Sequence, residues 1–290
     1  MGNKTLNDFR HFPRKRFGQH WLKDQAVLDQ IVKAARLTID DCVLEVGPGR
    51  GALTEKLIGS PAKFIQAIEL DRDLVVGLKK RFSNQDRFSL REGDVLSVPL
   101  QAENGLIVNK VVANIPYNIT GPLLKKLIGE LSKASDNRFE TLVLLMQKEV
   151  AERILAMPGD TNFSALSVRI QLLARCHDVC EVPPKCFQPP PKVDSKVVLI
   201  KPFMSVDRGF YEIGELLEKL LKIAFSSRRK KLRNTIGSFV TSKTHVKEFF
   251  DSRGISLDQR PQEISPSDWF ALAKALKESS VIKNEYSKCQ

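Results

Sequence analysis

Long apolar runs are missing from this chain of 290 residues. No stretch approaches the roughly 20 consecutive apolar residues that a membrane-spanning helix needs. The first residues, MGNKTLNDFRHFPRKR, lack the apolar core of a signal peptide. Leu6 also stands where an N-myristoylation motif requires Ser or Thr. We therefore expect a soluble protein that stays in the cytoplasm.

Acidic residues are in the minority, with 34 Asp and Glu against 46 Lys and Arg, which gives a formal net charge of +12. Such an excess favours an anionic partner, above all nucleic acid, because Lys and Arg displace the counterions condensed on a phosphate backbone. A basic surface that merely keeps the protein soluble is the alternative. The cations gather in two runs that could line one RNA-binding surface. These are Arg10, Arg14, Lys15 and Arg16, and then Arg228, Arg229, Lys230, Lys231 and Arg233.

Cysteine is scarce, and the five cysteines are odd in number and scattered, so reduced thiols are expected. Cys176, Cys180 and Cys186 lie near His177, a grouping that zinc could use. However, Cys176 and Cys180 occupy same-face positions of an apolar strand, where buried thiols are common. We therefore predict no metal site.

Short apolar runs alternate with helical segments over the first half of the chain, after a predicted helix at Asp24–Leu37. Such alternation is typical of an α/β fold, a parallel sheet with helices on both faces. The predicted strands are Cys42–Val46, Phe64–Leu70, Arg87–Gly93, Lys110–Ile115 and Thr141–Met146, and the helices between them include Asp71–Phe82 and Thr120–Leu131.

The second half continues with helices at Gln147–Leu155 and Phe163–Ala174, followed by two strand-like runs, HDVCEV and KVVLIKPF, around the loop PPKCFQPPPKVDS. Past Pro202 the pattern becomes purely helical, at Ile213–Phe225, Lys230–Phe239 and Ser267–Lys277. We therefore expect two domains with a boundary near Met204: residues 1–204 as an α/β domain, and residues 205–290 as a small all-α domain.

A glycine-rich turn follows the first strand of the predicted sheet, in VLEVGPGRGALT. Glycines such as Gly47 let the backbone approach a ligand closely. At the end of the next strand Glu69 can accept hydrogen bonds from both hydroxyls of a ribose. This pair is compatible with a methyltransferase, with a dinucleotide enzyme and with a purely structural turn.

A third side chain extends this series, because Asp94 ends the next strand at the same edge of the sheet. Its carboxylate can accept from an adenine amino group, although an Asp at a strand end is also an ordinary turn residue. Together, Gly47, Glu69 and Asp94 could hold the methionine, ribose and adenine parts of S-adenosylmethionine. We therefore expect the Rossmann-like sheet of a class I methyltransferase.

The most specific motif is Asn114-Ile115-Pro116-Tyr117, at the end of the fourth strand. An adenine amino nitrogen is a poor nucleophile until acceptors draw its hydrogens towards a tetrahedral arrangement. Asn114 Oδ1 and the Ile115 carbonyl oxygen can be those acceptors, Pro116 restricts the residue before it, and the Tyr117 ring can stack on an extruded base. The alternative is a β-turn with Asn and Pro in favoured positions. Phe187 could stack on the other side of the base, or could be a buried loop anchor.

These motifs together resemble the ribosomal RNA adenine dimethyltransferase family, most closely its bacterial small-subunit (16S) branch. The resemblance covers nearly the whole chain: RKRFGQHWL, VLEVGPGRG, AIELD, EGDVL, ANIPYNIT, LLMQKEVAERI, FQPPPKVDS and FSSRRKKLRNTI all match in order.

The resemblance implies that His20 and Leu22 close over S-adenosylmethionine and that Asn114 contacts both cofactor and substrate. It implies that Tyr117 and Phe187 flank the target base, that residues 1–204 are the catalytic domain that binds the cofactor, and that residues 205–290 bind RNA. It also implies dimethylation of two adjacent adenosines in a hairpin near the 3′ end of 16S rRNA, within the assembling 30S subunit. A monomer is the expected state.

Small departures from the family pattern are His20 where Asn is most common, Trp21 for Phe, and Ile115 for Leu. The last two exchange apolar residues. Histidine, in contrast, changes its charge near neutrality, so we predict that cofactor affinity weakens at low pH.

Three other functions remain open on the sequence. One is a large-subunit rRNA methyltransferase of the antibiotic-resistance type, against which FSSRRKKLRNTI and the helical C-terminal region argue. The second is a non-catalytic assembly factor, which the intact Asn114–Tyr117 motif disfavours. The third is a dehydrogenase, which would bind NAD.

Overall fold

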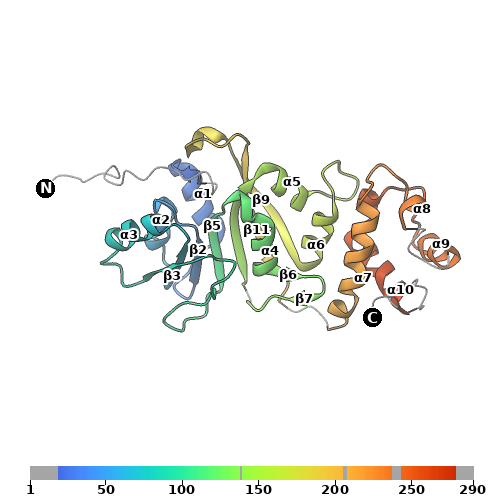
Figure 1. Cartoon of the computed structure of the whole chain (residues 1–290), viewed down its shortest axis with the longest axis horizontal. Helices are drawn as coiled ribbons and strands as arrows, with labels where there is room; N and C mark the ends of the chain where they lie inside the picture. Colours follow the sequence, from blue (N-terminus) through green and yellow to red (C-terminus); the bar gives the residue numbers. More distant parts are fainter. Residues whose placement is uncertain (1–18, 138, 205–207, 237–242, 279–290) are drawn as a thin grey trace, which may run out of the picture. The chain divides into compact units, whose positions relative to one another are not determined.

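The computed structural model describes residues 19–137, 139–204, 208–236 and 243–278 and divides into two compact units (Figure 1). Unit 1 contains the described residues up to Ile128, then Asp136–Ala151 and Cys176–Pro202. Unit 2 contains Gly129–Ser135, Glu152–Arg175 and the described residues from Phe203 onward. None of the described helices has the length and apolar content of a membrane span.

Unit 1 is built on a seven-stranded sheet in the order β4-β3-β2-β5-β8-β11-β9. Its strands are β2 (Cys42–Val46), β3 (Phe64–Glu69), β4 (Phe88–Glu92), β5 (Lys110–Asn114), β8 (Thr141–Gln147), β9 (Ala174–Val182) and β11 (Ser195–Pro202). The pairs from β4 to β8 are parallel, and β11 joins β8 antiparallel. Because the chain order reverses between β2 and β5, a ligand crevice is expected at the carboxyl ends of these strands.

The helices of unit 1 pack on a sheet that is buried on both faces. Val43, Ile65 and Val112 form a core with α1 (Gln25–Ala35) and α2 (Ala52–Ile58), while Ala67 and Leu90 pack against α3 (Arg72–Arg81). The alternate residues are equally buried, as the continuous apolar runs predict. These are Leu44, Ile68, Val111, Leu142 and Val198. The predicted α/β class is confirmed.

Helix α1 is fixed at both ends. Asp24 caps its first turn by accepting from Val27 N at 3.1 Å. At its carboxyl end, Lys110 Nζ donates to the Ala35 and Arg36 carbonyls and forms a 2.9 Å ion pair with the buried Asp41. This pair satisfies carbonyls that a helix end leaves without partners and ties α1 to the start of β5.

Several further short elements complete unit 1 beside the sheet. Strand β1 (Trp21–Leu22) pairs antiparallel with β10 (Phe187–Gln188), which follows the 3₁₀ turn η3 (Pro184–Cys186). After β5 come the 3₁₀ turn η2 (Tyr117–Ile119) and α4 (Thr120–Ile128). Helix α5 (Lys148–Leu155) follows β8 and continues into unit 2.

Unit 2 is helical apart from the small hairpin β6 (Gly129–Glu130) and β7 (Lys133–Ala134). Its helices are α6 (Ala165–Leu173), α7 (Arg208–Phe225), α8 (Leu232–Thr235), α9 (Lys243–Ser252) and α10 (Pro266–Glu278), with the 3₁₀ turn η5 (Pro261–Glu263). Helix α10 packs on α6, α7 and α9 around the buried Trp269. Gly214 lets α7 approach the hairpin, because a Cβ there would lie 2.0 Å from Leu131 O.

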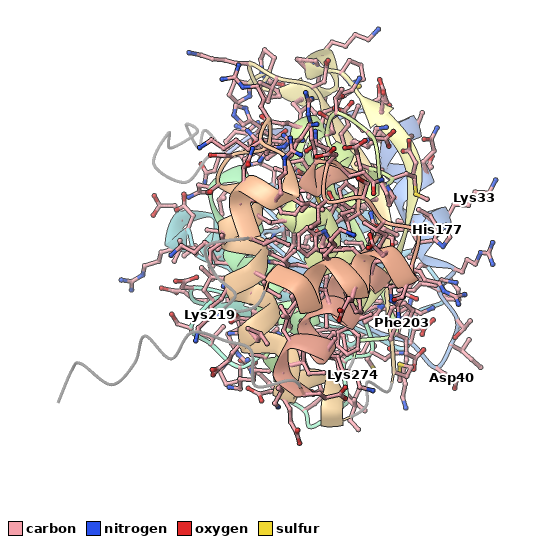
Figure 2. All side chains as sticks on the ribbon, turned by 90° about the vertical axis from the view of Figure 1, so that its right-hand side faces the viewer. Lys33, Asp40, His177, Phe203, Lys219 and Lys274 are labelled. Atoms are coloured by element: carbon pink, nitrogen blue, oxygen red, sulfur yellow. The ribbon has the colours of Figure 1, made fainter. Side chains whose placement is uncertain are left out.

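An open cavity of about 650 Å³ lies in unit 2 among α6, α7 and α10. Phe210 and Phe270 stack there, with ring centroids 4.9 Å apart, and Lys274 stands at the edge. Figure 2 labels Phe203 and Lys274, which line this cavity, and Lys219, on the exposed surface of α7.

The sequence-based boundary near Met204 is one residue from Phe203, where the chain enters unit 2 for the last time. Unit 2 also contains Gly129–Ser135 and Glu152–Arg175, which the sequence assigned to the first domain. The reason is packing, since α6 contacts α7 and α10, and β7 contacts α7.

Several predicted elements differ from those observed. The helix expected to run to Leu131 ends at Ile128, because Gly129 has a φ of +98° and begins a hairpin. The helix expected at 230–239 is observed as the single turn of α8, and residues 237–242 lie outside the described residues. Helix α9 was not predicted.

Candidate active site

A cavity of about 150 Å³ opens at the carboxyl edge of β2, β3 and β5 in unit 1. It brings together most of the residues that the sequence singles out. They are His20, Gly47, Glu69, Asp94, Asn114, Ile115 and Tyr117. These come from five separate strand ends and loops, so only the folded sheet assembles them.

The glycine turn forms the floor of this main cavity. Gly47 has a φ of +64°, and its amide donates to the Ile68 carbonyl at 2.9 Å, which holds the turn against β3. Gly49 has a φ of +59°, and a Cβ there would lie 2.7 Å from the Trp21 ring. The Trp21 ring in turn lies under the Arg50 guanidinium, 4.0 Å from the ring centroid. A side chain at Gly49 would therefore displace Trp21 from the cavity wall.

Glu69 connects the turn to the next loop. One carboxylate oxygen accepts from Gly49 N at 3.0 Å and the other from Asp71 N at 2.9 Å. Burial raises the pKa of this carboxyl, and these two amide hydrogen bonds oppose the shift. Each oxygen keeps a lone pair for a further donor, so the carboxylate can accept from two ribose hydroxyls.

Asp94 stands at the far end of the same row. Its Oδ1 accepts from Leu96 N at 2.9 Å, and the Ser97 hydroxyl lies 3.5 Å from Oδ2. The preceding Gly93 amide donates to the Glu69 carbonyl at 2.9 Å, which fixes the spacing between the two acids. Asp94 therefore lines the cavity with its side chain held in place by its own turn.

Asn114 is oriented by a partner far away in the sequence. Its Nδ2 donates to the His20 carbonyl oxygen at 3.1 Å. A backbone carbonyl can only accept, so the amide must present its NH₂ group to His20. The Oδ1 atom is thereby left as the acceptor, which is the role that the sequence predicts for it. The neighbouring Ile115 buries its side chain, 1% exposed, and contributes to the cavity wall.

The rings of Tyr117 and His20 lie over one another, with centroids 5.8 Å apart and planes 24° from parallel. The Tyr117 hydroxyl lies 2.6 Å from Ser195 Oγ, and His20 Nδ1 lies 2.9 Å from the Pro189 carbonyl oxygen. Both rings line the main cavity. The predicted effect of His20 on cofactor affinity stays a prediction.

Two predicted residues are not brought to the main cavity. Phe187 is 1% exposed and belongs to the core beneath α1, as the alternative of a buried loop anchor predicts, and its expected place beside the base stays a prediction. Leu22 is likewise in the core and contacts only a smaller cavity of about 30 Å³ next to the main one. Its neighbour Trp21 lines both cavities instead.

Glu45 is a residue that the sequence analysis missed. It is 1% exposed and lines the smaller cavity together with Gly47 and Asn114, and within the described residues neither carboxylate oxygen has a hydrogen-bond partner of good geometry. Burial raises its pKa to about 8; the Thr54 hydroxyl opposes this shift and the charge of Glu69 adds to it. Its signal in the sequence is the single acid inside the apolar strand CVLEV.

The smaller cavity provides a test of whether S-adenosylmethionine fits. A buried acidic group without a partner needs a donor or a cation, and the ammonium of a methionine moiety is one. Glu45 and the Gly47 backbone would thus hold the methionine end, Glu69 the ribose and Asp94 the adenine. The residues present fit the cofactor.

The five predicted RNA-binding cations differ in what surrounds them. Arg228 Nη2 donates to the Thr161 and Phe163 carbonyls at 2.5 and 2.7 Å. Asp258 pairs with both Lys231 and Arg233, at 3.5 and 2.6 Å. Arg229 and Lys230 are exposed.

The cysteine grouping considered for zinc is not assembled as a site. Among the residues that the structure describes, no cluster of three His, Cys, Asp or Glu side chains could hold a metal ion. Burial also raises the pKa of Cys176 to about 12, which disfavours the thiolate that zinc would need. Cys186 instead lies 3.5 Å from Asp24 Oδ2.

Comparison with known proteins decides the family. The model of the family "Ribosomal RNA adenine dimethylase" matches residues 10–278. The chain belongs to this family. It is thus a ribosomal RNA adenine dimethyltransferase dependent on S-adenosylmethionine, and the resemblance found in the sequence is confirmed.

Relatives and solved structures agree with this assignment. The chain is 81% identical to a ribosomal RNA small subunit methyltransferase A of Prochlorococcus marinus (strain NATL2A), covering 98% of this chain and 97% of the relative. It is 61% identical to the protein of that name from Synechococcus sp. (strain CC9902), over 92% and 97%. A dimethyladenosine transferase from Plasmodium falciparum superposes with a TM-score of 0.73 at 28% identity, over 91% and 99% of the two chains.

The 23S rRNA methyltransferase ErmE has the same fold, with a TM-score of 0.68 at 24% identity over 89% of this chain and 99% of that one. At this identity the likeness concerns the fold alone, so it does not select a substrate. The class I methyltransferase architecture is nevertheless confirmed by both structures.

Proposed function

We propose that this protein dimethylates N6 of two adjacent adenosines in a hairpin near the 3′ end of 16S rRNA. The product is N6,N6-dimethyladenosine at both positions, and the substrate is the assembling 30S subunit in the cytoplasm. Relatives of 81% and 61% identity named as small-subunit methyltransferases support the choice of subunit. The observation that carries the chemistry is the Asn114 amide, whose NH₂ is held by His20 so that Oδ1 can accept.

The residues of the chain orient both reactants. Asn114 Oδ1 and the Ile115 carbonyl accept the two hydrogens of the adenine amino group, so that its lone pair is no longer fully delocalised into the ring. The Tyr117 ring offers a face on which the extruded base stacks. Bound S-adenosylmethionine supplies an electrophilic methyl group on a sulfonium. The protein contributes alignment and electrostatics, and water takes the proton that the methylated nitrogen releases.

Arg229 and Lys230 are the two cations that we propose for contact with RNA phosphates, because their side chains are exposed. Arg228, Lys231 and Arg233 are proposed for the same surface, although carbonyls or Asp258 already engage them. A monomer is proposed, as suits an enzyme that docks on a large RNA surface.

The proposal is tested by methyl transfer from labelled S-adenosylmethionine to naked 16S rRNA, free small subunits, free large subunits and whole ribosomes, followed by mass mapping. We expect label in small-subunit RNA, at two adjacent adenosines that each carry two methyl groups. Label confined to large-subunit RNA would replace the proposal with the antibiotic-resistance type of activity, and absence of label with binding intact would favour an assembly factor.

A further inference from the structure

The far end of the Tyr117 side chain is attached to the protein. Its hydroxyl lies 2.6 Å from the hydroxyl of Ser195, the first residue of β11. Ser195 is 0% exposed and stands opposite Gln147 of β8 in the sheet, so its Oγ has a fixed position. The contact is partly buried, and a hydrogen bond between two hydroxyls at this distance is short and well formed.

Because its hydroxyl is engaged by Ser195, the ring is the part of Tyr117 that can meet a ligand. Burial raises the pKa of Tyr117, and the Ser195 hydroxyl only partly opposes this shift, so the phenol stays protonated near neutral pH. A protonated phenol held by a serine is not a base for the reaction. What Tyr117 presents to the main cavity is the face of its ring.

The segment of residues 187–195, which contains Ser195, also contacts the ring of His20 that lies over Tyr117. The Pro189 carbonyl oxygen is 2.9 Å from His20 Nδ1, and since a carbonyl only accepts, Nδ1 carries the hydrogen. Pro189 and Ser195 lie only six positions apart. Phe187, buried in the core, anchors the start of this segment. Residues 187–195 thus fix both rings of the cavity wall from their far ends.

We propose that Ser195 is a positioning residue for the methyl transfer, acting through the Tyr117 hydroxyl to set the plane of the ring on which the target adenine stacks. This inference rests on the proposed function. Tyr117 follows Pro116 at the start of a 3₁₀ turn, so its backbone is fixed at one end. The Ser195 hydrogen bond fixes the other end of the side chain. A ring held at both ends keeps one orientation even when no base is stacked on it.

Four variants test this assignment on small subunits with saturating S-adenosylmethionine: Ser195→Ala, Tyr117→Phe, the double variant, and Ser195→Thr. Each of the first two removes the same hydrogen bond, so we expect each to lower kcat about 3- to 10-fold. The KM for S-adenosylmethionine should change less than about twofold. The double variant should be no slower than the slower single variant, because the bond can be lost only once.

Ser195→Thr separates the hydroxyl from packing, since it keeps Oγ and adds a methyl group at a fully buried position. We expect it to retain a kcat within about threefold of wild type. A Thr variant as slow as Ser195→Ala would mean that Ser195 acts through packing, and would overturn the proposal. So would Ser195→Ala turning over at the wild-type rate, or effects of the two single changes that multiply in the double variant.

A spectroscopic measurement reads the contact without turnover. The chain has three tyrosines, so 3-fluorotyrosine labelling gives a simple ¹⁹F spectrum in which Tyr117→Phe identifies the Tyr117 signal. We expect Ser195→Ala to shift or broaden that signal alone, and an unchanged signal would refute the inference. If wild type transfers no methyl group to small-subunit RNA, the proposed function fails, whereas this spectrum still judges the role of Ser195 in holding Tyr117.

Discussion

The sheet edge in unit 1 and the basic segment Arg228–Arg233 in unit 2 were both singled out from the sequence, yet they use their polar groups differently. At the sheet edge, Glu69 and Asn114 are each held by backbone groups and still keep acceptor atoms for a ligand. In the basic segment, three of the five predicted cations are engaged within the protein. A motif with defined spacing therefore predicts a site better than a run of charge, which also serves internal contacts.

The sharpest way to break this comparison is Asn114→Ala. It removes an acceptor needed to activate the amino group, so we expect methyl transfer to fall about a thousandfold or more, as when a preorganised polar group is removed from other active sites. Affinity for RNA should change little, because RNA binding depends on contacts outside this amide. Single-turnover methylation and RNA titration measure the two effects.

The matched control is Asn104→Ala, the same substitution in an exposed loop of unit 1 where Asn104 accepts only from Leu106 N. It should leave turnover at the wild-type level. Turnover of the Asn114 variant within tenfold of wild type would remove the amide from the mechanism.

The second prediction concerns Glu45 at the sheet edge, and compares how the free energy of unfolding of wild type and of Glu45→Gln depends on pH. The pKa of Glu45 in the folded protein, about 8, lies above its ordinary value of 4.5, so the folded state keeps a proton that the unfolded state releases. The stability from this proton is therefore present at low pH and is lost as pH rises from 4.5 to 8. Between pH 5 and 8 we expect wild type to lose about 3 kcal/mol relative to Glu45→Gln.

Urea unfolding of both proteins without cofactor, at four pH values, measures this difference. Groups that do not interact with Glu45 titrate alike in both proteins and cancel in the subtraction. If the two curves of unfolding free energy against pH run parallel, the pKa of Glu45 is not raised in the folded protein, and this account of Glu45 is wrong.

For the basic segment, we expect the pair Arg229→Ala and Lys230→Ala to weaken RNA binding about tenfold near 0.1 M salt and to reduce the slope of log affinity against log salt by about 2. Lys79→Ala with Lys80→Ala, two exposed cations of α3, is the charge-matched control and should leave the slope close to wild type. Equal slopes for the Arg229/Lys230 pair and the Lys79/Lys80 pair would show that the segment acts through net charge alone.

Arg228→Ala should instead lower the melting temperature of the protein, because the carbonyl partners of Arg228 lose their donor.

The smallest expected effect concerns His20. Because its ring stands in the cavity wall, His20→Asn, which restores the residue most common in the family, should change the affinity for S-adenosylmethionine by no more than about threefold. Calorimetric titration measures both proteins, and a larger change would give the His20 side chain a direct part in holding the cofactor.

The sheet and the main row of site residues could be predicted because each depends on local pattern. Apolar runs identify buried strands, and since parallel strands end at one edge, Gly47, Glu69, Asp94 and Asn114 had to lie close together. The hairpin after α4 could not be foreseen from periodicity, which continues to Leu131 across Gly129.

The residues that were missed depend on partners distant in the chain. Ser195 meets Tyr117 across 78 positions, which no local pattern records. On β1, successive side chains point in opposite directions, so Trp21 faces the cavity while Leu22 faces the core. The motif alone did not indicate which of the two residues lines the cavity. For Phe187 the motif located the loop, but it did not indicate that the side chain packs in the core.

The pairing of β1 with β10 has a consequence for how the enzyme is made. Trp21 lies opposite Gln188, so one wall of the pocket is completed only when two segments 167 positions apart in the sequence meet. A nascent polypeptide that has emerged only as far as β8 already carries the glycine turn, Glu69, Asp94 and Asn114, but neither the strand that pairs with Trp21 nor the Pro189 carbonyl that contacts His20. The part of the cavity wall that Trp21 forms is therefore completed late in translation, after almost two thirds of the chain has been synthesised.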